Sequence, residues 1–395
     1  MRWRASISDE ANERQQFIAA AEDCHAHNVR FPNSLDEVQM LQSLGDSAFA
    51  RYLLGCFWYS KRRYDEAVSC WRETLEKSPD YAPAHRLLGV YSWNKQQDAT
   101  QALAYLQRAV ALEPDNARFL FELDFLQKLL ARPVHERLTT LVERKAVVLK
   151  RDDLTAELLS LWNASGHYAD AAAILDTRVF HPWEGGEGKI TGQYLLNQLH
   201  LALQFIERGA FKQATDCLKA ALRYPDTLGE GRLPGQTDND IWYLLGYCAE
   251  QAGDAQQAAE YYQLARQGGS TLDAGRYYND QPADYLFWQG IALRKSGNPA
   301  QAEQHFRHFI DWAAQHRDDV PQVDFFAVSL PDLVVLDVSA QQRHLQHCLF
   351  IEALGHLGLG NVSACQQRMQ QLLQINPAHD KAHLIRHALQ SGIFS

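Results

Sequence analysis

The stretch YLLGCFWYSKRRYDEAVSCWRETLEKSPD, Tyr52–Asp80, decides the fold, because the order of its small and bulky residues returns in the next stretch of the chain. That next stretch is RLLGVYSWNKQQDATQALAYLQRAVALEPD, Arg86–Asp115. Gly55 and Gly89 stand 34 residues apart, each after a leucine. A small residue at this place allows two antiparallel helices to approach closely, and bulky residues fill the space to the next pair. The repetition therefore predicts a stack of helical hairpins.

The spacing is that of the tetratricopeptide repeat, which is about 34 residues long. Ala67 recurs as Ala102 after 35 residues, and both stretches resemble that repeat closely. Further copies follow, so we predict an all-α fold, an α-solenoid of tetratricopeptide-like hairpins. The residues predicted to pack the repeats are Leu54, Gly55, Ala67, Leu88, Gly89, Ala102, Trp242, Leu245, Gly246, Ala258, Gly290 and Ala302.

The repeats also divide the chain. We predict N-terminal capping helices over 1–47, then tetratricopeptide repeats and a degenerate helical pair over 48–150. Longer repeats with inserted loops follow over 151–314, and an extended loop over 315–340. A C-terminal repeat and capping helix complete the chain over 341–395.

The longer repeats are the informative departure from a plain solenoid. Ala214, Ala258 and Ala302 follow one another at intervals of 44 residues. Turns inside the hairpins stay short, so the extra residues fall between one hairpin and the next. Such connections emerge along one edge of a solenoid, so these loops should form a rim that binds a ligand or covers helix ends. The ligand-binding candidates on this rim are His181, Trp183, Glu184, Glu187, Lys189, Glu230, Arg232, Arg276 and Tyr277.

The rim loop HPWEGGEGK, residues 181–189, carries glycines, acids and a lysine, which raises the question of a phosphate loop. That motif needs a glycine five residues before Gly188 and Ser or Thr after Lys189, whereas Trp183 and Ile190 stand there. The two glutamates would suit sugar hydrolysis, but a loop spacing does not set the distance that this mechanism requires. We predict no catalytic residue and no cofactor.

Three histidines of the last predicted helix fall on one face. His379, His383 and His387 are spaced four residues apart, and two histidines one turn apart can bind zinc. No HExxH motif accompanies them, and a third ligand from outside the helix is missing. We therefore expect a solvent-facing stripe of histidines and no metal.

Composition excludes several classes of partner. The net charge of −10 and the sequence pI near 5.9 argue against sequence-independent binding to nucleic acid. No apolar run approaches the roughly 18 residues of a membrane span, and the start lacks the apolar core of a secretory signal. The seven cysteines are scattered and form no CxxC pair. We expect a cytoplasmic protein without a membrane or nucleic-acid partner.

Taken together, HPWEGGEGK, LGEGR, FFAVSLPDLVVLD and LGHLGLGN resemble the C-terminal part of a family of large bacterial proteins. In that family a β-rich N-terminal domain of unknown function precedes tetratricopeptide units. The resemblance covers most of the chain and implies no catalytic residue. No counterpart of the N-terminal domain precedes Met1, so we expect either a free-standing array or the remnant of a longer protein.

Two functions follow from this reading. The first is a non-catalytic scaffold that binds a peptide or partner protein in the solenoid groove, with Trp58, Tyr59, Tyr91 and Trp93 as anchors if they face it. The alternative is a small-molecule site on the rim, with carbohydrate as the ligand class. An enzyme that acts on carbohydrate is the least favoured version of this alternative. It would be built around Trp183, Glu184, Glu187, Glu230 and Arg232.

Overall fold

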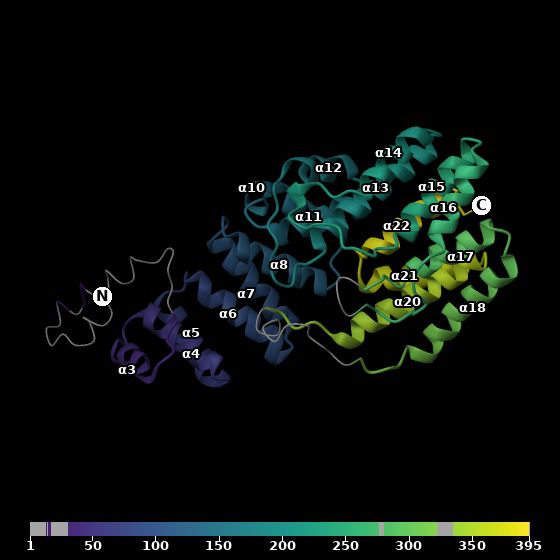
Figure 1. The fold of residues 1–395 in the computed structure, drawn as a ribbon. Coiled ribbons are helices and arrows are strands. Elements are labelled where there is room, and N and C mark those ends of the chain that lie inside the picture. Colours follow the sequence, from purple (N-terminus) through teal and green to yellow (C-terminus); the bar gives the residue numbers. More distant parts are fainter. Residues whose placement is uncertain (1–12, 14, 17–30, 276–279, 322–334, 395) are drawn as a thin grey trace. The chain divides into compact units, whose positions relative to one another are not determined.

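The computed structural model describes residues 13, 15–16, 31–275, 280–321 and 335–394 (Figure 1). All regular secondary structure in this part of the chain is helical, which confirms the predicted all-α solenoid of hairpins. The chain forms two compact units. The first contains Met1–Leu126 with Val335–Asp337, and the second contains Gln127–Val334 with Val338–Ser395.

The first unit is a stack of antiparallel helices. Its elements are α3 (Leu35–Ser43), α4 (Ala48–Ser60), α5 (Tyr64–Lys77), α6 (Ala82–Tyr91), η1 (Ser92–Gln96), α7 (Ala99–Leu112) and most of α8 (Ala117–Leu129).

The second unit continues with longer connections between its hairpins. Its elements are α9 (Val134–Glu143), α10 (Lys145–Val148), α11 (Asp152–Ala164), α12 (Tyr168–Thr177), α13 (Lys189–Glu207), α14 (Phe211–Ala221), the short 3₁₀ turn η2 (Asp226–Leu228), α15 (Asn239–Gln251), α16 (Ala255–Ala265), α17 (Tyr285–Lys295), α18 (Pro299–His316), α20 (Ala340–Gly358), α21 (Val362–Ile375) and α22 (Asp380–Gln390). Within the described residues, no helix is both long and apolar enough to cross a bilayer.

Side-chain caps fix where several of these helices begin. Ser47 accepts a hydrogen bond from the Ala50 amide, 3.1 Å away, at the start of α4. Asp98 and Asp254 do the same for α7 and α16, at 2.9 and 3.0 Å. Each bond satisfies an amide that has no partner within its own helix, so a cap sets the first residue of the helix.

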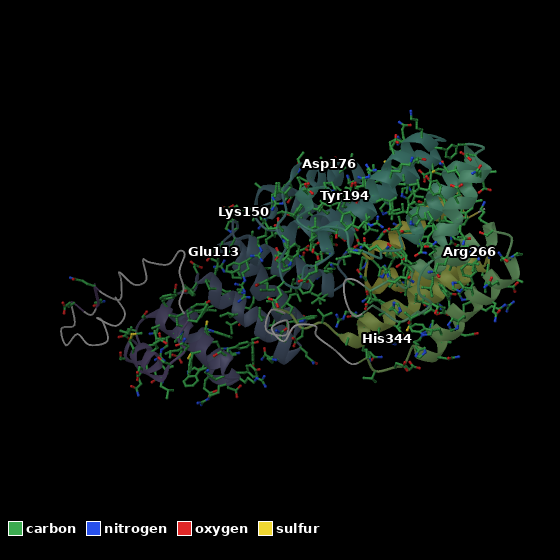
Figure 2. All side chains as sticks on the ribbon, viewed as in Figure 1. Glu113, Lys150, Asp176, Tyr194, Arg266 and His344 are labelled. Carbon is green, nitrogen blue, oxygen red and sulfur yellow. The ribbon has the colours of Figure 1, made fainter. Side chains whose placement is uncertain are left out.

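Several hairpins are held by a glycine on the first helix and a bulky residue on the second. A Cβ atom at Gly246 would lie 2.6 Å from the Tyr262 ring, and one at Gly290 would lie 2.6 Å from the Phe306 ring. Gly55 faces the buried Trp71 in the same way. The side chains that fill the spaces between helices are drawn in Figure 2. A second side chain of any size at these positions would separate the two helices.

One hairpin departs from this pattern by a turn of π-helix. The distance from glycine to alanine is 12 residues in Gly55–Ala67 but 13 in Gly89–Ala102. In η1 the backbone N–H of Gln97 donates to the carbonyl of Ser92, five residues earlier, and Gln97 ends the turn with φ of 56°. A π turn takes up one residue more than an α turn, so η1 accommodates the added residue without shifting α7.

Gly246→Ala should lower the free energy of unfolding of the second unit by about 1–3 kcal/mol, because the new methyl group overlaps the buried Tyr262 ring. Gly192→Ala is the matched control, since nothing lies within 4 Å of its added Cβ and alanine favours a helix. Urea unfolding of the full chain measures both. Equal stability of the two variants would contradict the proposed role of the glycine.

Candidate functional site

In the first unit, a segment of the chain itself is bound to η1. Asn94 Nδ2 donates to the carbonyl of Val335 at 2.8 Å, and the amide of Asp337 donates to Asn94 Oδ1 at 2.8 Å. The indole N–H of Trp93 donates to the carbonyl of Asp337 at 2.9 Å. We call Trp93 and Asn94 the Asn94 clamp. It holds backbone groups on both sides of Leu336, whose side chain is fully buried.

Aromatic side chains adjoin the clamp. Burial raises the pKa of the Tyr59 hydroxyl, Tyr64 and Asp337 raise it further, and a hydrogen bond with Asn94 lowers it. The hydroxyl of Tyr59 therefore lies beside the clamp. The Tyr64 ring lies 5.2 Å from the Tyr59 ring and 6.4 Å from the Tyr91 ring, between centroids. Three of the four predicted anchors, Tyr59, Tyr91 and Trp93, therefore lie at or near the bound segment.

The fourth predicted anchor lies elsewhere in its own hairpin. The Trp58 ring is covered by the guanidinium of Arg63, which lies 4.7 Å from its centroid. It also meets the Phe57 ring edge-on at 5.1 Å. Trp58 thus contributes to packing around the turn that follows α4.

The second unit presents a face formed by α11, α13, α15 and α17, the first helices of four successive hairpins. We call it the inner face. The groove that the sequence predicts here is covered, because α22 lies along it and contacts α11 and α13 (Figure 1). The apolar side of α22, with Ala382, Leu384, Ile385 and Ala388, is buried.

The first turn of α22 is held by hydrogen bonds and ion pairs. The carboxylate of Asp380 accepts from Ser160 Oγ on α11 at 2.7 Å and from Gln193 Nε2 on α13 at 2.8 Å. Lys381 Nζ lies 3.1 Å from Asp284 Oδ2 and 3.6 Å from Asp240 Oδ2.

These charges perturb one another. Burial alone would lower the pKa of Lys381, but Asp284 and Asp240 outweigh it and hold that pKa above its ordinary value. Burial, with the neighbouring Asp284, raises the pKa of Asp240. One ammonium therefore faces two carboxylates in the interior of the unit.

The middle of α22 carries a stack of rings. His387 Nδ1 lies 2.8 Å from His200 Nδ1 on α13 and 3.3 Å from the Tyr168 hydroxyl. The Tyr168 and His200 rings stack with centroids 4.5 Å apart. His387 Nε2 lies 3.4 Å from a carboxylate oxygen of Glu207. Because two Nδ1 atoms meet, one of the two rings must donate and the other accept.

The prediction that the α22 histidines face solvent was wrong. His383 and His387 are 8% and 9% exposed, because the helix is covered on the side that they occupy. His383 Nε2 contacts the carbonyl of Pro377 at 2.7 Å. The described residues contain no group of three His, Cys, Asp or Glu side chains placed to hold a metal ion.

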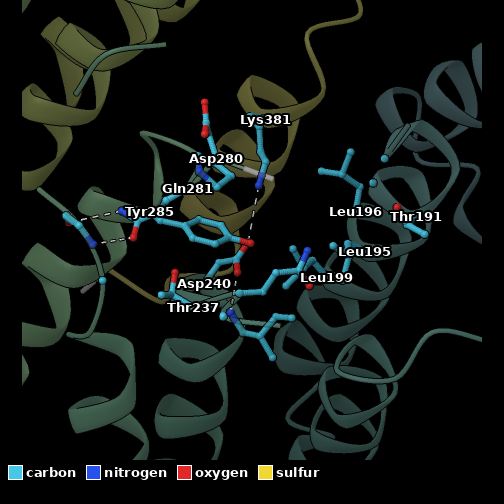
Figure 3. Close-up of a pocket in the computed structure, with 18 of the residues that line it drawn as sticks. Thr191, Leu195, Leu196, Leu199, Thr237, Asp240, Asp280, Gln281, Tyr285 and Lys381 are labelled. Carbon is cyan, nitrogen blue, oxygen red and sulfur yellow. Dashed lines mark hydrogen bonds and ion pairs between the residues drawn. The ribbon is translucent and has the colours of Figure 1, made fainter. Parts of the chain in front are cut away.

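The loops between hairpins meet the start of α22 at a cavity of about 490 Å³. Figure 3 shows Asp280, Gln281 and Tyr285 on one side of it and Thr191, Leu195 and Leu196 on the other, with Lys381 and Asp240 pointing toward one another. We call this space the rim cavity. Three of the loops between hairpins, over 180–189, 224–240 and 266–282, contribute to its lining.

None of the predicted rim residues that the structure describes belongs to the lining of this cavity. Glu230 accepts from the Gly188 amide at 3.1 Å, and Arg232 pairs with Asp238. The Trp183 ring packs on Gly186 of its own loop, which also carries Glu184 and Glu187. Glu230, Arg232 and Trp183 therefore make contacts within and between the loops.

The other rim candidates are also placed by local contacts. The His181 amide donates to the carboxylate of Asp152 at 2.9 Å. Burial lowers the pKa of Lys189, and the charge of Glu157 opposes this shift. Arg276 and Tyr277 lie outside the described residues. Sequence reasoning missed Lys381 and Asp240, because 141 residues separate them and neither belongs to a motif.

Comparison with known proteins identifies the repeats. A family model described as tetratricopeptide repeat matches residues 59–117 and 199–274. The first range contains α5, α6 and α7 of the first unit, and the second contains the last part of α13 with α14, α15 and α16 of the second unit.

Three solved structures are among those similar to this chain. The type IV pilus biogenesis factor PilW is 17% identical, with 55% of this chain and 90% of that chain covered and a TM-score of 0.29. The apo quorum sensor NprR of B. thuringiensis is 11% identical, with coverages of 95% and 96% and a TM-score of 0.33. The P58(IPK) TPR domain is 15% identical, with coverages of 87% and 99% and a TM-score of 0.26.

Acidification should destabilise the second unit. Burial lowers the pKa of His200, His383 and His387 below the ordinary value of 6.5, and that of His379 to about 4. Since the folded state holds these rings neutral, their stabilisation is complete above about pH 6.5 and is lost as pH falls toward the lower folded values. Each ring contributes at most about 1.4 kcal/mol per pH unit.

Thermal unfolding of the full chain between pH 7.5 and pH 5 tests this prediction. His387→Gln keeps a polar side chain but cannot titrate, so it should reduce the loss of stability across this range. His308→Gln, at an exposed position of α18, is the matched control. An unchanged pH dependence in His387→Gln would exclude His387 as a source of the effect.

Proposed function

We propose that this chain, which contains tetratricopeptide repeats, is a non-catalytic scaffold that binds a segment of a partner protein through the Asn94 clamp. Arrays of such repeats serve generally as surfaces for protein–protein interaction. The observation that carries the proposal is the pair of hydrogen bonds from one Asn94 side chain to the backbone of Val335 and Asp337.

The clamp has the chemistry of a site that recognises a peptide. An asparagine amide offers a donor and an acceptor together, so it can pair with a carbonyl and an N–H of one peptide backbone. Such pairing does not depend on the side chains of the bound segment. Selectivity would come from the residue between the two paired groups, because Leu336 is fully buried there.

The preferred partner segment would therefore carry a large aliphatic residue between two backbone groups held by Asn94. The Trp93 indole adds a third bond to the carbonyl that follows. Tyr59 and Tyr64 provide aromatic surface beside it. A few residues usually contribute most of the binding energy of an interface, and aromatic residues in desolvated places are common among them.

Fewer contacts support the alternative of a small-molecule site on the rim. Glu230 and Arg232 are paired within the loops, and Trp183 packs on its own loop. A carbohydrate site needs such side chains to converge on one space, and the rim cavity is lined by other residues.

The test measures binding of a labelled peptide with the sequence of residues 330–340, LPDLVVLDVSA. The receptor is the full chain carrying Leu336→Ala, which weakens its own bound segment. We expect saturable binding by fluorescence anisotropy. Adding Asn94→Ala should weaken it about tenfold or more, because two hydrogen bonds of about 0.5–1.5 kcal/mol each are lost.

Asn298→Ala is the matched control, at an exposed asparagine of the second unit. A peptide with Asp in place of Leu336 should not bind, since the buried site would have to accept a charge. Binding that is equally tight with and without Asn94 would overturn the assignment of the clamp as a peptide site.

A further inference from the structure

We propose that the rim cavity of the second unit binds a small organic cation, a primary amine with an apolar body. The cavity has a volume of about 490 Å³. Pockets of about 300–1,000 Å³ are the usual size for small-molecule ligands. The proposal uses neither the Asn94 clamp nor the residues predicted for a carbohydrate site, so it can hold or fail independently of both.

The loops around the cavity are fixed by side chains that bind their backbone. Asn239 Nδ2 and Gln289 Nε2 both donate to the carbonyl of Gln267, at 2.6 and 3.0 Å. Gln281 Oε1 accepts from the amide of Gly269 at 2.8 Å. These bonds hold the loop after α16 against α15 and α17, so the walls of the cavity have a defined position. A site whose walls are fixed in advance spares its ligand the cost of ordering them.

One wall of the cavity is apolar. It is formed by Leu195, Leu196 and Leu199 of α13 together with Ile241 of α15 (Figure 3). Leu199 and Ile241 are each 1% exposed. These side chains offer no hydrogen bond, so a polyol would leave hydroxyl groups unpaired against them. The part of the ligand that faces this wall is therefore expected to be apolar.

The opposite wall carries an excess of negative charge. The Lys381 ammonium lies 3.1 Å from Asp284 Oδ2 but 3.6 Å from Asp240 Oδ2. Asp240 is 2% exposed, and its Oδ1 accepts from the Ile241 amide at 2.9 Å. One ammonium thus faces two buried carboxylates, and the more distant carboxylate lines the cavity. A cation in the cavity would pair with Asp240, whereas an anion would add to the uncompensated charge.

The pKa of Asp240 agrees with this account. Burial raises that pKa, Lys381 lowers it and Asp284 raises it again, with a net shift above the ordinary value. The Lys381 ammonium therefore does not fully offset the cost of burying an ionised Asp240. A second cation beside this carboxylate would stabilise its charged form.

Tyr285 adds an unpaired hydroxyl to the charged wall. Tyr285 is 8% exposed, and its hydroxyl makes no hydrogen bond with any residue that the structure describes. Burial raises the pKa of Tyr285 and the charges of Asp240 and Asp284 raise it further, so the hydroxyl lies near both carboxylates. Buried polar groups are almost always hydrogen-bonded. An ammonium group has several N–H donors, so one such group can bind Asp240 and Tyr285 together.

The experiment compares three probes that share an apolar body and differ in their head group. Phenylbutylamine, phenylbutanol and phenylbutyrate are each titrated into the full chain at pH 7, with binding measured by isothermal titration calorimetry. We expect saturable binding of the amine. The alcohol should bind at least tenfold more weakly, because it lacks a charge to pair with Asp240, and the acid should not bind.

Variants of the chain place the site. Gly192→Phe adds a ring to the cavity from α13, where nothing lies within 4 Å of an added Cβ, and should abolish amine binding. Gly231→Phe is the matched control, since its added Cβ is equally free of contacts but lies outside the lining. Asp240→Asn should weaken amine binding at least tenfold, to the level of the alcohol. Asp216→Asn, at an exposed position of α14, should leave it unchanged.

Tyr285→Phe keeps the proposal testable if Gly192→Phe does not fold. It removes only the hydroxyl, so amine binding should weaken at least threefold. Equal affinities for the amine and the alcohol, or no amine binding up to about 5 mM, would overturn the proposal. Amine binding that is as tight in folded Gly192→Phe or in Asp240→Asn as in the wild type would also overturn it, by placing the amine elsewhere.

Discussion

In several hairpins of this protein, a glycine on the first helix lies against a large side chain on the second. Gly55 faces Trp71, Gly246 faces Tyr262 and Gly290 faces Phe306. The contact brings the two helices close and buries the large side chain at the same time. Because the contact recurs along the chain, the first helices of successive hairpins fall on one face of a unit. Both candidate sites depend on that arrangement, since each uses side chains from first helices or from the turns that follow them.

The sequence predicts the fold well because the information that specifies a hairpin is local. Gly246 and Tyr262 lie 16 residues apart, and the same grid of small and bulky residues returns from one repeat to the next. The position of α22 could not be predicted in this way. Its partners Ser160 and Gln193 precede Asp380 by 220 and 187 residues, and no periodicity links them. The α22 histidines were therefore expected to face solvent, although neighbouring helices cover them.

The candidate sites were predictable in part. Aromatic residues near the end of α4 and in η1 indicated the region of the clamp, and Tyr59 and Trp93 lie there. The sequence did not indicate Asn94 as a site residue, because asparagine near the end of a helix is common in turns. The rim loops were predicted to lie together, and three of them line one cavity. Which of their side chains point into that cavity depends on backbone turns that spacing alone does not determine.

The π turn at Ser92–Gln96 shows how one repeat can accommodate an inserted residue. An inserted residue in an α-helix rotates everything after it by about 100° and would break the contact between Gly89 and Leu106. Here the extra residue is confined to a single widened turn, and α7 keeps its place. The same turn carries Trp93 and Asn94, which hold the bound segment. A gain of one residue in length can therefore create a new recognition element in a repeat whose packing stays intact.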